Sequence, residues 1–140
     1  MNLHLLYLSK WKEDKFFNTC DILNHVVIGV LKKGRRVEKE TYEERLLDAF
    51  LDPFRLRIID LLMDAGRMYP RQIAEKLNAD RSKVVYHLHI LEKADLVHSE
   101  YAVVKPHSSP AKFAKFYFVN EEKLKKAASL VEKYLEEFRE

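Results

Sequence analysis

The sequence predicts a mainly α-helical fold that carries one β-hairpin. Three observations indicate it: a helical period of about 3.6 residues runs from Thr41 to Ala94, a period of 2 covers residues 96–119, and the helical period returns from Asn120. The chain has 140 residues, 47% hydrophobic and 34% charged, which is typical of one globular domain.

The first helix is predicted to begin in TYEERLLDAF, where Thr41 is an N-cap and Glu44 completes a capping box. The second is predicted in DPFRLRIIDLLMDAG, with Asp52 as N-cap, Pro53 at the first helical position and Gly66 past the end. The expected inward-facing residues of these two helices are Leu46, Leu47, Phe50, Leu56, Ile59, Leu62 and Met63.

A short third helix is predicted in YPRQIAEKLN, with Pro70 near its start. A tight Ala-Asp connection then leads to a fourth helix from Arg81 to Ala94. Two helices joined by so short a turn are typical of a helix–turn–helix. The third helix is expected to bury Ile73, Ala74 and Leu77.

The segments LVHSEYAVV and KFAKFYFV are rich in Val, Tyr and Phe and flank the loop KPHSSPA, which predicts a β-hairpin. A last helix is predicted after Asn120 as N-cap, with one apolar face. This order of elements describes a winged helix–turn–helix with flanking N- and C-terminal helices. We expect residues 41–119 to form it, residues 120–140 to add a C-terminal helix, and residues 1–40 to be an N-terminal extension.

The fourth helix has two different sides. At about 100° per residue, Val84, Leu88 and Leu91 point to one side and pack inward. A helix that shows polar and aromatic side chains on its other side, with cations at its start, suits the DNA major groove. The alternative is an ordinary solvated helix face. The outward residues are Ser82, Val85, Tyr86 and His89, with Arg81 and Lys83 at the helix start.

Charge is distributed unevenly, although the net charge is only +3. Residues 41–66 hold three Arg against six acids, whereas residues 67–119 hold nine Lys and Arg against five acids and four of the six histidines. A basic middle segment fits a nucleic-acid partner, but ordinary variation in a charged sequence produces such segments too.

The stretches LLDAFLDPFRLRIIDLL and RQIAEKLNADRSKVVYHLHILEKADLV, with the hairpin after them, resemble the ArsR-type winged-helix transcriptional regulators over about residues 45–119. The resemblance implies a homodimer that places helix 82–94 of each subunit in successive major grooves and wing 97–119 on the backbone or minor groove. Terminal helices would form the dimer contact. Carried over by position, base and phosphate contacts fall on Arg81, Ser82, Val85 and Tyr86.

The sequence departs from the family in three places. RMYPRQIAEKL has no cysteine, which excludes a thiolate metal sensor of the kind common in the family. Asp95 stands where a glycine is usual, so we expect an aspartate in a left-handed conformation. The wing tip is longer and richer in proline than is usual.

Further contacts are expected on the wing and the last helix. Lys105, Lys112, Lys115 and Arg67 are candidate phosphate contacts, with a solvated surface side chain as the alternative for each. The apolar face of the last helix either forms a symmetric dimer contact or covers the domain's own core. The expected dimer-contact residues are Leu124, Ala128, Val131, Leu135 and Phe138.

Catalytic, metal and cofactor chemistry is not expected. His87 and His89 point about 200° apart on a helix and cannot share an ion, and His87 is expected to be semi-buried. His98 and His107 make only a weak metal hypothesis. Asp60, Asp64 and Glu75 are scattered surface acids, and no phosphate-binding or nucleophile motif is present.

The single cysteine, Cys20, cannot form an internal disulfide, and no signal peptide or membrane span is recognisable. We therefore expect a cytoplasmic protein. For residues 1–40, KKGRRVEKE is either a basic arm or, because it can be encoded almost wholly by purines like a ribosome-binding site, the sequence before a true start at Val37.

The sequence thus predicts a prokaryotic, homodimeric transcription regulator that binds double-stranded DNA, with no membrane partner and no identifiable effector. The alternative is a winged helix that serves as a protein–protein interaction module of the transcription machinery.

Overall fold

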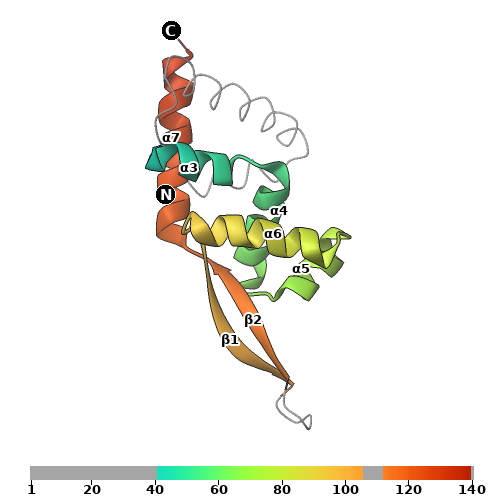
Figure 1. Cartoon of the computed structure of the whole chain (residues 1–140). Helices are drawn as coiled ribbons and strands as arrows, with labels where there is room; N and C mark the ends of the chain where they lie inside the picture. The colour runs from blue at the N-terminus through green and yellow to red at the C-terminus, as the bar shows by residue number, and fades with distance from the viewer. Residues whose placement is uncertain (1–40, 106–111, 140) are drawn as a thin grey trace. The chain divides into compact units, whose positions relative to one another are not determined.

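The computed structural model describes residues 41–105 and 112–139, which form five helices and one hairpin (Figure 1). They belong to two compact units, residues 41–56 with 121–139, and residues 57–105 with 112–120. The expectations for residues 1–40, including a start at Val37, and for the tip 106–111 lie outside the described residues. The elements are α3 (Tyr42–Phe50), α4 (Pro53–Ala65), α5 (Pro70–Leu77), α6 (Arg81–Lys93), β1 (Val97–Lys105), β2 (Lys112–Val119) and α7 (Glu121–Glu137).

The capping box at the start of α3 is confirmed. Thr41 Oγ1 accepts a hydrogen bond from the Glu44 amide at 3.3 Å, and Glu44 Oε2 accepts one from the Thr41 amide at 2.9 Å. Asp52 caps α4 as expected, since its Oδ1 accepts from the Arg55 amide at 3.0 Å. Local sequence signals therefore determine where both helices begin.

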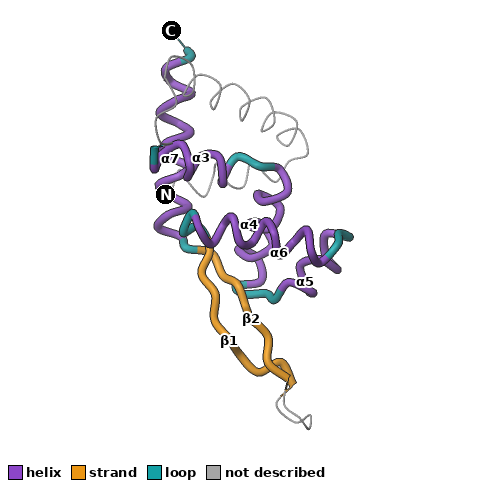
Figure 2. Tube along the Cα trace, viewed as in Figure 1, coloured by secondary structure: helices purple, strands orange, loops and turns teal. Residues whose placement is uncertain are grey.

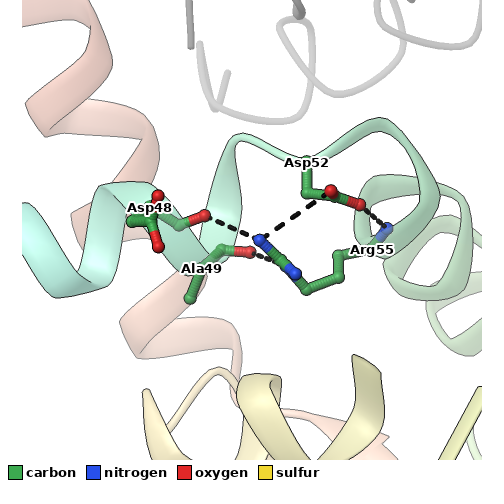
Figure 3. Close-up of polar contacts among 4 residues, drawn as sticks. All are labelled: Asp48, Ala49, Asp52 and Arg55. Carbon is green, nitrogen blue, oxygen red and sulfur yellow. Dashed lines mark hydrogen bonds and ion pairs between the residues drawn. The ribbon is translucent and has the colours of Figure 1, made fainter. Parts of the chain in front are cut away.

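A buried arginine joins the end of α3 to the start of α4 (Figure 3). Arg55 Nε donates to the Ala49 carbonyl at 2.6 Å, and its Nη2 donates to the Asp48 carbonyl at 2.9 Å. Asp52 Oδ2 lies 3.9 Å from the same Nη2. The last carbonyls of a helix have no intrahelical partner and carry partial negative charge, so a guanidinium there stabilises the end of α3.

Helix α7 packs against α3 within the first unit. Much of its apolar face is buried, including Leu124 and Val131. The Tyr134 hydroxyl donates to Glu43 Oε2 at 3.4 Å, and burial together with the Glu43 charge raises the pKa of Tyr134. Along this part of α7, the apolar face covers the chain's own core.

In the second unit, α5 and α6 are joined by a short turn (Figure 2). Asn78 ends α5 with φ 49°, and Asp95 follows α6 with φ 63°, which confirms the expected left-handed aspartate. The Asn120 side-chain amide donates to the Asp95 carbonyl at 2.9 Å, so this turn is tied to the end of β2.

The core of the second unit lies between α4, α5, α6 and the base of the hairpin. Two residues expected in the core, Met63 and Leu77, are only half-buried. Met63 lies at the edge of the apolar face of α4, and Leu77 is the last residue of α5. The fully buried side chains include Ile58, Leu62, Ile73, Val84, Leu88, Leu91 and Leu96.

The hairpin is confirmed as two antiparallel strands, with Val97 opposite Val119 and Val103 opposite Phe113. The segment before α5 pairs with its edge, since Met68 and Tyr117 exchange two backbone hydrogen bonds of 3.1 and 2.8 Å. These contacts fix the base of the wing, which extends away from α5 and α6 (Figure 1).

We expect Arg55→Ala to lower the free energy of unfolding by about 3 kcal/mol, because it leaves one buried and one partly buried carbonyl without a charged donor. Arg57→Ala, which removes an exposed arginine from the same helix, is the matched control and should change it by less than about 0.5 kcal/mol. Urea unfolding measures both. Equal effects of the two substitutions would contradict a structural role for the guanidinium.

Candidate nucleic-acid interface

Helix α6 has one buried and one exposed side, as its sequence predicts. Val84, Leu88 and Leu91 are fully buried. His87, expected to be semi-buried, is half-buried. The residues expected to face outward, Arg81, Ser82, Lys83, Val85, Tyr86 and His89, are all exposed.

The exposed side offers mixed chemistry. Tyr86 is 62% exposed, and its ring meets the His87 ring edge-on, with 5.2 Å between centroids. Its hydroxyl, the Ser82 hydroxyl and the His89 imidazole are groups that hydrogen-bond to base edges or phosphates. Val85, 42% exposed, adds an apolar side chain of the kind that contacts thymine methyl groups.

Glu92, in the last turn of α6, joins that helix to the wing. Its Oε1 accepts from Ser99 Oγ at 2.6 Å, and its Oε2 accepts from Lys115 Nζ at 3.2 Å. Ser99 belongs to β1 and Lys115 to β2, so one carboxylate holds both strands against the helix. Sequence reasoning missed this contact.

The contact between Glu92 and Lys115 favours the charged form of both side chains. The hydrogen bond from Ser99 lowers the pKa of Glu92. Partial burial raises this pKa, and the hydrogen bond and charge of Lys115 lower it further. For Lys115, burial alone would lower the pKa, but hydrogen bonds with Glu92 and Tyr117 outweigh it, and the pKa is raised. Both groups are therefore held in their charged forms.

The opposite face of the wing is held by the segment before α5. Arg67 Nη1 lies 2.7 Å from Glu100 Oε1, and its guanidinium stacks on the Phe116 ring at 4.8 Å. Tyr69 meets the same ring edge-on at 5.3 Å. The hairpin is thus fastened on both faces at its base.

These contacts involve two of the residues that the sequence predicts to bind phosphate. The ammonium of Lys115 and the guanidinium of Arg67 are engaged with carboxylates of the chain itself. Lys112 is exposed, and the side chain of Lys105 lies outside the description. Phosphate binding by the wing stays a prediction, and Lys112 is the described lysine best placed for it.

The residues expected at a dimer contact differ in access. Leu124, Ala128 and Val131 are buried within the single chain, whereas Leu135 is half-buried and Phe138 is 47% exposed. Of the five expected dimer-contact residues, those near the C-terminal end of α7 are therefore the most accessible to a second chain.

Other kinds of site find no support in the described part of the chain. Residues 41–105 and 112–139 contain no group of three or more His, Cys, Asp or Glu side chains placed to hold a metal ion. His98 pairs instead with Asp95 at 3.5 Å, and His107 lies outside the description. Among the described helices, none has the length and apolar character needed to cross a bilayer.

A helix–turn–helix with one exposed helix side, followed by an antiparallel wing, defines a winged helix–turn–helix protein. A family model described as bacterial regulatory protein, arsR family, matches residues 52–99. An uncharacterized HTH-type transcriptional regulator of Methanocaldococcus jannaschii is 38% identical over 60 residues, which cover 41% of this chain and 67% of that protein. The chain belongs to the ArsR family of helix–turn–helix regulatory proteins.

The fold is also similar to that of a solved structure. A transcriptional regulator homologue from Pyrococcus horikoshii OT3 superposes with a TM-score of 0.50 at 15% identity, over 71% of this chain and 99% of that one. The YusO protein from Bacillus subtilis superposes with a TM-score of 0.45 at 13% identity, over 91% of this chain and 84% of that one.

We expect Glu92→Gln to lower the free energy of unfolding by about 1 kcal/mol at neutral pH, because it removes the charge from a carboxylate that holds two strands. Since the pKa of Glu92 is lower in the folded than in the unfolded chain, its contribution is present above the unfolded-state pKa. It is lost as the pH falls through the folded-state pKa.

Unfolding by urea at a series of pH values, for the unmodified protein and Glu92→Gln, measures this difference. The two curves should converge on acidification. Glu100→Gln, in a more exposed ion pair, is the control with a smaller expected effect. Curves that stay parallel through the acid range would show that the Glu92 charge does not hold the wing.

Proposed function

We propose that this protein is a homodimeric transcription regulator that binds duplex DNA sequence-specifically, with α6 in the major groove and the wing beside it. The observation that carries the proposal is the exposed side of α6. Ser82, Tyr86 and His89 stand outward from a helix whose other side is anchored in the core. The major groove admits one α-helix, and hydrogen-bonding side chains distinguish the base pairs there.

The start of α6 supports a phosphate contact. Asp80 is the N-cap residue, but its side chain makes no capping hydrogen bond. The first amides of a helix have no intrahelical acceptor, and the helix dipole favours an anion there. Arg81 and Lys83 are exposed in the same turn and bring two further positive charges.

The proposed homodimer fits the same function. A homodimer places two recognition helices about 34 Å apart, so that each meets the major groove one helical turn from the other. Leu135 in the last turn of α7 and Phe138, which follows the helix, give an apolar surface that the chain itself leaves partly open. A twofold contact between two such surfaces is the commonest way in which soluble proteins form dimers.

Selection of bound fragments from random duplexes tests the function directly. We expect a motif of two inverted half-sites whose centres lie about 10 bp apart or a multiple of this. Affinity should fall steeply with added salt because bound phosphates release counterions. If the protein instead binds a protein partner in a salt-insensitive manner and enriches no duplex, the interaction-module alternative is correct.

Variants of α6 separate the two kinds of contact. Arg81→Ala should weaken binding to all sequences and reduce the slope of log affinity against log salt by about 1. Tyr86→Ala should instead weaken the selected site more than random duplex, with little change in slope. Lys93→Ala, at the other end of α6, is the matched control. Equal salt slopes for all three variants would argue against phosphate contacts at the helix start.

Phe138→Lys should shift the protein from dimer to monomer in sedimentation experiments, because a charge would enter an apolar contact. Glu137→Lys adds positive charge at the neighbouring exposed position and is the control. A dimer that withstands Phe138→Lys would show that the contact lies elsewhere.

A further inference from the structure

The outer half of the hairpin exposes three apolar side chains. Tyr101 is 77% exposed, Phe113 is 67% exposed and Val103 is 42% exposed. Val103 lies directly opposite Phe113, and Tyr101 lies opposite Lys115, so the register places the three apolar side chains side by side on one face. We call these three residues the wing patch. Large exposed rings gathered at one place are typical of a surface that another molecule covers.

The strand that carries most of the wing patch also has an open edge. The described sheet has two strands, and the outer edge of β2 pairs at Tyr117 with Met68, which precedes α5. No described residue pairs with the outer edge of β1. From Val97 to Val104 this edge carries neither proline nor lysine, two residues that commonly protect such edges. The backbone of β1 can therefore accept a further strand.

A second copy of β1 fits this edge. Two copies related by a twofold axis run antiparallel, so that each face of one hairpin continues into the same face of the other. With the axis at Ala102, Tyr101 of each copy lies opposite Val103 of the other, and Phe113 lies one strand further out. Pairs of an aromatic and a β-branched residue stabilise sheets. In this register no lysine of β1 faces a lysine, and no glutamate faces a glutamate.

The area of the wing patch indicates where such a contact can form. From the roughly 150–250 Å² that an aromatic side chain buries, the two rings and the valine offer about 300 Å² per copy. A symmetric contact then buries about 600 Å², whereas stable interfaces bury about 1,200–2,000 Å². Residues 101–115 also carry three lysines and no acid, so two free wings repel each other. The contact is too weak to join chains in free solution.

A shared duplex removes both obstacles. Phosphates neutralise the charge of lysines that lie close to them. Two dimers bound at neighbouring sites also meet at an effective concentration in the millimolar range, because the duplex links them. A patch that is too small for association in free solution is therefore large enough for a contact between two dimers on the same DNA.

We propose that the wing patch is a contact between neighbouring dimers on DNA. The open edges of β1 from two dimers pair antiparallel, and Tyr101, Val103 and Phe113 of the two copies cover one another. Adjacent operators are then filled cooperatively. The inference rests on the proposed function, because the duplex brings the two copies together, and it adds a second copy of this chain as a partner of the wing.

The test uses the full chain and duplexes built from a site that this chain selects, with one copy or with two copies at spacings that increase by one base pair. We expect the unmodified protein to bind paired sites about tenfold more tightly than a single site at a favourable spacing. The gain should vanish about 5 bp away, because half a turn places the second dimer on the other side of the duplex.

Variants of the hairpin assign this gain to the wing patch. Tyr101→Thr/Phe113→Thr removes both rings, keeps a residue suited to strands and changes no charge. It should bind the single site as the unmodified protein does and show no gain on paired sites. His98→Thr, at an exposed position on the other face of β1, is the matched control and should keep the gain. Circular dichroism and thermal unfolding check that the variants fold.

A cross-link tests the pairing of the two edges. With the axis at Ala102, the two Ala102 Cα atoms lie about 4.5–5.5 Å apart, within the range that a disulfide spans. In a Cys20→Ser background, Ala102→Cys with oxidised glutathione should therefore link two chains on paired sites and not on a single site. His98→Cys is the control, because its two copies lie about 27 Å apart in this register. It should form no link.

Four outcomes would overturn the inference. If paired sites give no gain, if the double variant keeps the gain, or if Ala102→Cys forms no link on paired sites, the two wings do not meet in this way. If the double variant loses affinity equally for single and paired sites, the wing patch contacts DNA itself. If it becomes monomeric in sedimentation without DNA, the wing patch belongs to the contact within one dimer. If the unmodified chain enriches no duplex, the proposed function fails first and the inference with it.

Discussion

Burial of Val84, Leu88 and Leu91 fixes the direction of every other side chain on α6. Each of these side chains contributes roughly 1.5–3 kcal/mol when it is removed from water. If α6 were rotated about its axis, the three apolar side chains would be exposed, and Ser82 or Tyr86 would be buried without hydrogen-bond partners. The outward set is therefore a consequence of the core, and the exposed chemistry of α6 follows from three apolar residues.

Features with a local cause could be predicted from the sequence. The starts of α3 and α4 follow from Thr41 with Glu44 and from Asp52 with Pro53, because capping acts within one turn. The hairpin follows from its alternation of polar and apolar residues. The left-handed Asp95 follows from the position where the family resemblance expects glycine.

Contacts between distant residues could not be predicted in this way. Glu92 and Lys115 are 23 positions apart, and nothing in either segment's period says that they meet. Sequence reasoning assigned Lys115 to phosphate for this reason. Arg55 was missed because a charged residue beside an apolar stripe is normally solvated, and only the turn between α3 and α4 brings carbonyls to it. Tyr101 and Phe113 appeared only as strand-forming residues, since exposure depends on where α6 ends along the hairpin.

Side-chain contacts hold the base of the hairpin on both of its faces. Glu92 on one face and Arg67 on the other set the spacing between α6 and the outer strand residues before any ligand arrives. The hairpin base is thus preorganised, and little of its conformational entropy is left to lose when a partner binds.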